Sequence, residues 1–182
     1  MDAAVQIRPV VMETESPSLA GELTKTFREY RLRIFHFALQ KVGNREDALD
    51  ITQETFLRLH RHWHRRQEGK PLAPWIYSIA RNLSIDVLRK RGSRREDDLE
   101  TAPRQHSGPG PEALAQQNET KARVWNAINQ LPEALRETLI LRDIHGLSYT
   151  EIAQALNVPT TTVTSRLHDA RQKLRKKLEK YL

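Results

Sequence analysis

The fold of this chain is decided by residues 147–167, which read LSYTEIAQALNVPTTTVTSRL. Ser148, followed three residues later by Glu151, forms a capping box. In this motif each side chain satisfies a backbone N–H of the other residue, so the pair predicts that a helix begins here. The apolar residues that follow share one helical face: Ile152, Ala155 and Leu156.

A second helix is predicted directly after the first. Asn157 can adopt the left-handed conformation that ends a helix, and Pro159 suits the first position of the next one. An apolar stripe then continues through Val163, Leu167, Ala170 and Leu174. Two short helices joined by a turn of about three residues predict a helix-turn-helix, whose second helix enters the DNA major groove.

The outward face of the second helix separates a DNA reader from an ordinary helical hairpin. With Val163 and Leu167 buried, small hydroxyl groups and basic groups point away from the core, and a basic run follows them up to Lys180. Small side chains allow close approach to base edges, and basic side chains suit phosphate. This favours DNA binding over the hairpin interpretation. The candidate contact residues are Thr161, Thr162, Thr164, Ser165, Arg166, His168 and Arg171.

Composition narrows the class of protein. The 182 residues carry a formal net charge of +7, which favours a polyanionic partner but also fits ribosomal and membrane-surface proteins. With no cysteine, the chain has neither a disulfide framework nor a cysteine-based zinc site. There is no apolar run long enough to span a bilayer, and residues 1–18 lack a signal-peptide core. We therefore expect a cytoplasmic protein.

Helical periodicity recurs along the rest of the chain, and no segment alternates like a strand. The expected fold is all-α, with two small helical domains joined by a flexible linker and a helix-turn-helix in the second domain. We expect a flexible arm over residues 1–18, a first domain over 19–92, a linker rich in proline and glycine over 93–111, and a second domain over 112–182.

Three further stretches carry a family resemblance. Residues 47–59, DALDITQETFLRL, resemble the polymerase-binding helix of bacterial RNA polymerase sigma factors. Residues 74–82, PWIYSIARN, with 85–90, IDVLRK, look like their promoter-melting and minus-ten helix. Residues 131–142 and 146–171 are similar to their minus-thirty-five reader. Two matched domains without the usual intervening domain resemble the short extracytoplasmic-function class.

This resemblance implies a function and its partners. The chain would bind core RNA polymerase, through the β′ clamp helices and the β flap, and would direct it to promoter DNA. It would also help to open the duplex, and an anti-sigma factor is a further partner that the resemblance allows. No cofactor and no small-molecule substrate are implied.

The resemblance also assigns the candidate residues to surfaces. An acidic and polar stripe would bind polymerase: Asp47, Asp50, Gln53, Glu54 and Phe56. A mixed aromatic, basic and amide surface would hold the minus-ten strand: Trp75, Tyr77, Arg81, Asn82, Arg89 and Lys90. The loop of residues 67–73 would take a base flipped from that strand. The residues named above on the second helix of the helix-turn-helix would read the minus-thirty-five element.

Each of these surfaces also has a purely structural interpretation. An acidic stripe is usually a solvated helix face, and Trp75 fits a core position. The chain also departs from the family, which often has Gly-Thr-Val-Lys or Gly-Thr-Val-Arg where this chain has Thr161-Thr162-Val163-Thr164, and a basic residue in place of Asp169. Both changes remove positive charge at the groove.

Metal binding and catalysis find little support. His60 and His64 share a helix face near His62, but two histidines without a nearby carboxylate or cysteine ligand make a poor zinc site. There is no glycine-rich phosphate loop and no nucleophile with a base beside it, so no enzyme is indicated. Two alternatives to a sigma factor remain: a stand-alone helix-turn-helix regulator, which would dimerise to read paired half-sites, and a sigma-like protein kept for protein contacts alone.

Overall fold

The computed structural model describes residues 17–67, 69–97 and 119–179, and within those ranges all regular structure is helical. The first group comprises α1 (Pro17–Val42), α2 (Arg45–Arg61), the 3₁₀ turn η1 (Trp63–Arg65) and α3 (Ala73–Asp97). The second comprises α5 (Glu119–Asn129), α6 (Glu133–Leu139), the π-helical turn η2 (Ile140–Ile144), α7 (Tyr149–Leu156) and α8 (Thr160–Leu178). The all-helical prediction is confirmed.

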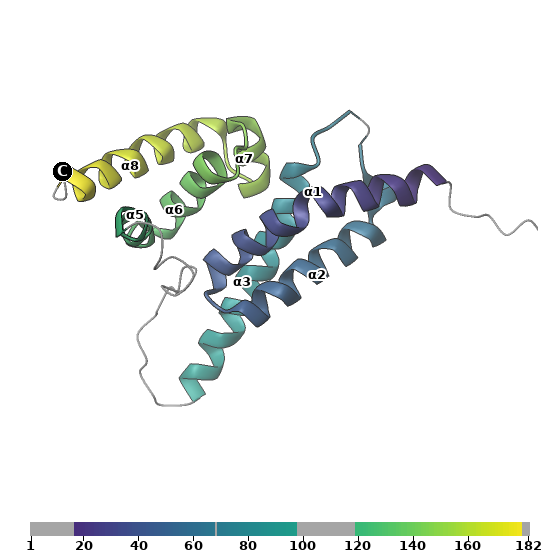
Figure 1. Cartoon of the computed structure of the whole chain (residues 1–182), viewed down its shortest axis with the longest axis horizontal. Helices are drawn as coiled ribbons and strands as arrows, with labels where there is room; N and C mark the ends of the chain where they lie inside the picture. The colour runs from purple at the N-terminus through teal and green to yellow at the C-terminus, as the bar shows by residue number, and fades with distance from the viewer. Residues whose placement is uncertain (1–16, 68, 98–118, 180–182) are drawn as a thin grey trace, which may run out of the picture.

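The first group is a three-helix unit in which α1 packs against both α2 and α3, and α2 packs against α3 (Figure 1). Its largest fully buried side chains are Tyr77, Phe37, Ile34, Leu59 and Ile76. The Asn44 side chain accepts a hydrogen bond from the N–H of Asp47 at 3.0 Å and so caps the start of α2. α3 continues to Asp97, beyond the boundary expected at residue 92.

The helix-turn-helix follows its predicted signals. The Ser148 hydroxyl accepts a hydrogen bond from the N–H of Glu151, and the Glu151 carboxylate accepts one from the N–H of Ser148 at 2.7 Å. Asn157 ends α7 with a left-handed φ of 53°. Pro159 stands just before α8, and its carbonyl accepts the first hydrogen bonds of that helix, from the N–H groups of Thr162 and Val163.

The turn before the helix-turn-helix is widened. The N–H of His145 donates to the carbonyl of Ile140 at 3.0 Å, a π-type hydrogen bond that closes η2. Gly146 then takes a φ of 73°, a conformation that favours glycine because it has no Cβ. The wider turn sets where Asp143 and His145 lie at the end of η2.

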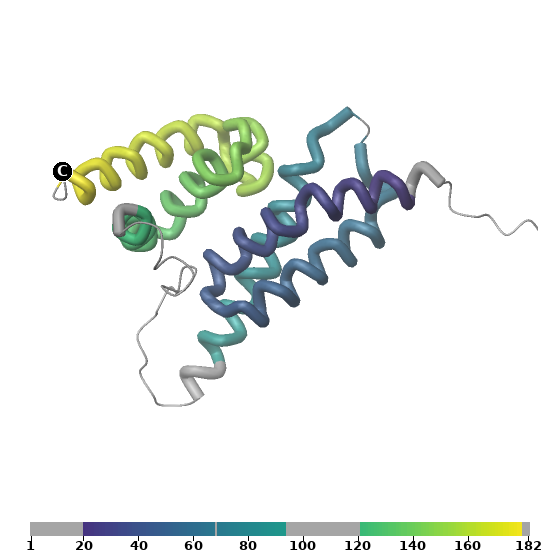
Figure 2. The backbone as a smooth tube through the Cα atoms, in the orientation of Figure 1, coloured from purple at the N-terminus to yellow at the C-terminus, as the bar shows by residue number. Residues whose placement is uncertain are grey.

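The two groups of helices form one continuous packed unit. The core of the second group, built on Leu141, Leu147, Ile152 and Leu167, belongs to the same cluster of buried residues as the core of the first. α7 packs on α3, and this contact is visible where α7 approaches the first group in Figures 1 and 2. The sequence predicts a flexible linker between the two domains and does not predict this contact. The predicted arm and linker lie largely outside the described residues.

Candidate nucleic-acid and polymerase interfaces

The face of α8 that the sequence assigns to DNA is free of the core. Val163, Leu167 and Ala170 are buried, whereas the candidate readers Thr161, Thr164, Ser165, His168 and Arg171 are exposed, and Thr162 and Arg166 are half-buried. The Thr164 and Ser165 hydroxyls donate to carbonyls one turn earlier, at 3.1 and 3.0 Å. Their oxygens therefore remain outward as acceptors for groups on a base edge.

Arg171 differs from a simple phosphate contact. Its guanidinium forms an ion pair with Asp143 of η2, with Nη2 lying 2.8 Å from Oδ1. The hydrogen bond that Arg171 donates to Asp143 raises the pKa of Arg171 above its ordinary value. Both side chains are about half exposed, so the pair ties α8 to η2 while it offsets one positive charge of the reading helix.

The surface predicted to hold the minus-ten strand is only partly exposed. Asn82, Arg89 and Lys90 are open to solvent on α3, and Trp75 is half-buried. Arg81 is half-buried and lies with its Nε 3.2 Å from the carboxylate of Glu137 in α6. The exposed face of α3 therefore lies directly beside a face that the second group covers.

Tyr77 is buried and does not lie on the exposed surface to which the sequence-based prediction assigned it. Its side chain is 1% exposed and its ring packs at right angles to Phe37, with centroids 5.3 Å apart. The centroid of the His145 ring lies 5.2 Å from that of Tyr77. Burial raises the pKa of Tyr77 to about 12, partly offset by Arg33. In this arrangement Tyr77 is an interdomain core residue and cannot stack on a base.

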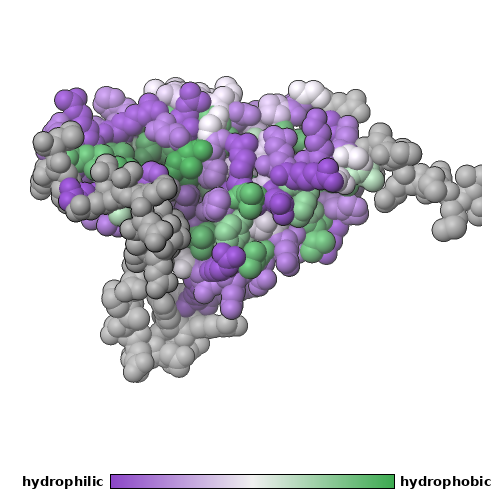
Figure 3. All heavy atoms as spheres, viewed as in Figure 1, coloured by the Kyte–Doolittle hydropathy of each residue, from purple (hydrophilic) through white to green (hydrophobic). Residues whose placement is uncertain are grey.

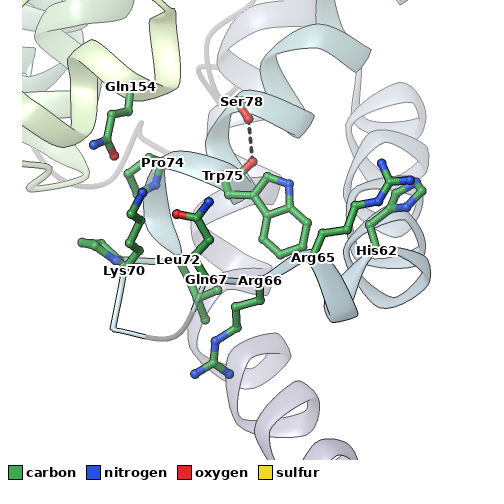
Figure 4. Close-up of a pocket in the computed structure, with 11 residues that line it drawn as sticks. His62, Arg65, Arg66, Gln67, Lys70, Leu72, Pro74, Trp75, Ser78 and Gln154 are labelled. Atoms are coloured by element: carbon green, nitrogen blue, oxygen red, sulfur yellow. Dashed lines mark hydrogen bonds between the residues drawn. The ribbon is translucent and has the colours of Figure 1, made fainter.

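A pocket of ≈ 400 Å³ opens at the start of α3, within the roughly 300–1,000 Å³ usual for ligand sites (Figure 4). The loop predicted to take a flipped base contributes Gln67, Lys70, Pro71 and Leu72, and Trp75 faces them from α3. The remaining lining includes His62 and two arginines, Arg65 and Arg66. Gln154 reaches the same pocket from α7, so both helical groups line it.

Basic side chains offset part of the negative charge of the predicted polymerase stripe on α2. Asp47 forms an ion pair with Arg91 of α3, whose guanidinium also donates to the carbonyl of Val42 at 2.8 Å. The hydrogen bond from Arg58, at 2.8 Å, lowers the pKa of Glu54. Asp50 and Gln53 are exposed, and Asp50 forms no ion pair with the other described residues.

Exposed apolar side chains that the sequence-based prediction left out lie on α1 and α2, in addition to Phe56 of the predicted stripe. Phe56 is half-buried and packs edge-on against Phe27, with ring centroids 4.9 Å apart. Phe27, Leu49 and Leu57 are 44%, 42% and 50% exposed. Large apolar groups beside charged ones are typical of a protein interface. Figure 3 shows such hydrophobic groups among the hydrophilic residues that cover most of the visible face.

The histidines show no ligand geometry in the described part of the chain. His60, His62 and His64 are exposed, and the rings of His62 and His64 lie 6.4 Å apart. Among residues 17–67, 69–97 and 119–179, no group of three or more histidine, cysteine or acidic side chains could hold a metal ion. No helix in those ranges is long and apolar enough to cross a membrane.

Comparison with known proteins identifies both groups of helices. Residues 26–94 match Sigma-70 region 2, and residues 121–174 match the family described as Sigma-70, region 4. SigE of Mycolicibacterium smegmatis, an ECF RNA polymerase sigma factor, is 37% identical over 85% of this chain and 60% of its own length. SigW of Bacillus subtilis, also an ECF sigma factor, is 32% identical over 82% of this chain and 84% of its own length.

Solved structures share the fold. The sigma factor RpoE in complex with the anti-sigma factor NepR, from Bartonella quintana, aligns with a TM-score of 0.69 and 22% identity over 87% of this chain and 97% of its own. CnrH in complex with the cytosolic domain of CnrY aligns at 0.66 and 20% identity, over 89% and 96%. Because region 2 and region 4 are both matched in order, the comparisons favour a sigma factor over a stand-alone regulator. The chain belongs to the extracytoplasmic-function class of the sigma-70 family of RNA polymerase sigma factors.

Proposed function

We propose that this sigma factor divides its work among three surfaces. The stripe on α2 around Asp50 and Gln53, with its apolar neighbours, binds core RNA polymerase. The exposed face of α8 reads the minus-thirty-five duplex. The exposed face of α3, together with the pocket beside Trp75, captures the minus-ten strand. No catalytic group is needed, because promoter opening is driven by binding the separated strand.

The pocket is the observation that carries this proposal most directly. A flipped base needs a concave site with an aromatic surface and a basic path for the backbone phosphates. The pocket combines Trp75 with Arg65, Arg66 and Lys70, and the exposed Asn82 follows its lining residue Ser78 by about one turn of α3. A site of this composition suits a single strand better than a duplex, whose bases are stacked and paired.

The partners follow from the same division of surfaces. Because the chain works with RNA polymerase and promoter DNA, we place it in the cytoplasm. We also propose an anti-sigma partner, since RpoE of similar fold was solved with the anti-sigma factor NepR.

Transcription assays on two matched templates test strand capture. Asn82→Ala, with core polymerase, should slow open-complex formation on a duplex promoter and have less effect on the same promoter carrying a pre-melted bubble. Asn126→Ala, which removes an exposed amide from α5, should behave as wild type on both templates. Equal loss on the two templates would remove the melting role of Asn82, and no loss on either would remove the site.

A further inference from the structure

The contact between the two domains covers part of the surface proposed to bind the minus-ten strand. α7 packs on α3, and the covered face of α3 includes Tyr77 and Arg81. Asn82 is the next residue along the same helix and remains exposed. Gln154 of α7 also lines the strand pocket. The second domain therefore covers part of the α3 surface that a bound strand would contact.

A buried acidic side chain joins the domains. Glu137 of α6 is 7% exposed and accepts from two cations of the first domain. Lys41 Nζ of α1 lies 2.7 Å from Glu137 Oε1, and Arg81 Nε of α3 lies 3.2 Å from the carboxylate. The Lys41 side chain is 8% exposed, so this pair is desolvated. Charges removed from water in this way depend strongly on their partners.

A carboxylate in this place resembles a phosphate group of DNA. Both are oxyanions that accept hydrogen bonds from guanidinium and ammonium groups. Arg81 belongs to the surface assigned to the minus-ten strand, so Glu137 satisfies with an internal anion a cation that the strand would otherwise contact. The first helix of a helix-turn-helix normally crosses the DNA backbone, and here α7 is instead engaged with α3.

Aromatic contacts of His145 join the two domains in addition to this ion bridge. His145, at the end of η2, is 6% exposed and packs on the rings of Phe37 and Tyr77, with centroids 5.9 and 5.2 Å away. The guanidinium of Arg33 donates a hydrogen bond to the His145 carbonyl. Phe37 of α1 and Tyr77 of α3, the two rings that contact His145, belong to the first domain. Separation of the domains would remove this contact from both rings.

We propose that Glu137 is an autoinhibitory latch, which holds region 4 on region 2 through Lys41 and Arg81 and restricts access of the minus-ten strand to the free protein. The latch opens when a polyanionic strand or the polymerase competes for these surfaces. The inhibitory part of this inference rests on the proposed role of the α3 surface, whereas the closed state itself does not.

The test measures opening and strand binding separately on the full chain. Because the chain has no cysteine, Arg28→Cys on α1 and Gln172→Cys on α8, both exposed, accept a donor and an acceptor dye for energy transfer. Glu137→Gln keeps the shape of the side chain and removes its charge. Lys41→Gln removes the partner from the first domain and serves as an independent variant. Glu133→Gln, on the same helix and also beside Lys41 but 59% exposed, is the matched control.

Glu137→Gln and Lys41→Gln should both lower energy transfer without DNA, with circular dichroism confirming intact helices, and Glu133→Gln should change it much less. In fluorescence anisotropy, the affinity of Glu137→Gln for a single-stranded minus-ten oligonucleotide should rise about fivefold or more, as is typical of coupled sites. Unchanged energy transfer in both latch variants would overturn the latch. Lowered energy transfer without a gain in strand affinity would overturn its inhibitory role. Loss of strand capture in Asn82→Ala tests the proposed function independently of either result.

Discussion

Acid should separate the two domains, and His145 sets the size of the effect. Burial against Phe37 and Tyr77, with smaller contributions from Arg33 and His36, lowers the pKa of His145 from 6.5 to about 4. Its Nε2 is buried and has no hydrogen-bond partner among the described residues. Protonation in the closed state would place a charge there without solvent, beside the cationic Arg33. The closed state therefore favours the neutral form of the His145 imidazole.

The direction of the pH effect follows from this lowered pKa. The open state binds the proton more tightly, so the stability of the closed state is fully present above about pH 6.5 and is lost as the pH falls toward 4. If opening restores the ordinary pKa, lowering the pH from 7 to 5 weakens closure by about 2 kcal/mol, or roughly twentyfold in the closing equilibrium constant. This window lies above the ordinary range of carboxyl groups.

Energy transfer between the dyes at positions 28 and 172 measures this change. The wild-type signal should fall between pH 7 and pH 5. His145→Gln, which cannot titrate, should lose the pH dependence in this window, whereas His168→Gln, which alters an exposed imidazole on α8, should keep it. The reasoning is refuted if the wild-type signal stays flat, or if His145→Gln responds to pH as the wild type does.

Three further predictions concern the helix-turn-helix. Asp143→Asn releases Arg171 from its ion pair, so affinity for duplex DNA of any sequence should rise and the salt dependence should steepen by up to about one unit in a log–log titration. Ser165→Ala should instead change which minus-thirty-five sequence is preferred, as a selection from randomised duplexes would show; unaltered preference would mean that the reading face is assigned wrongly. Ser148→Ala removes the side-chain cap of α7 and should lower the free energy of unfolding by about 1 kcal/mol in a urea titration, with an undiminished value excluding a stabilising cap.

Local signals made the helical fold predictable from the sequence. The capping residue Ser148 and the left-handed Asn157 lie where the sequence predicts them, because each motif is complete within a few residues. The apolar stripe of α8 is equally local, since helical spacing alone puts Val163 and Leu167 on one face. The DNA-facing side of α8 follows from that stripe by exclusion.

Contacts between distant residues could not be predicted in this way. Asp47 fits an exposed acidic stripe by spacing, but Arg91, 44 positions away, pairs with it. Tyr77 fits a surface of aromatic and basic residues, but the face it shares with Arg81 is covered when region 4 packs on α3. Glu137 carried no local signal, because its two partners come from α1 and α3. The contacts of Tyr77 and Glu137 lie between the domains, and the Asp47–Arg91 pair joins α2 to α3 within the first domain.

Binding of core RNA polymerase by a charge-reversed α2 tests the central claim most directly. Asp50→Arg combined with Leu57→Glu alters two exposed side chains of the proposed dock, and surface changes of this kind usually shift stability by about 0.5 kcal/mol or less. The control is Glu29→Arg, which reverses an exposed charge on α1. We predict that wild type and control co-purify with core polymerase and start transcription, whereas the folded double variant does neither. Normal polymerase binding by the double variant would contradict the account.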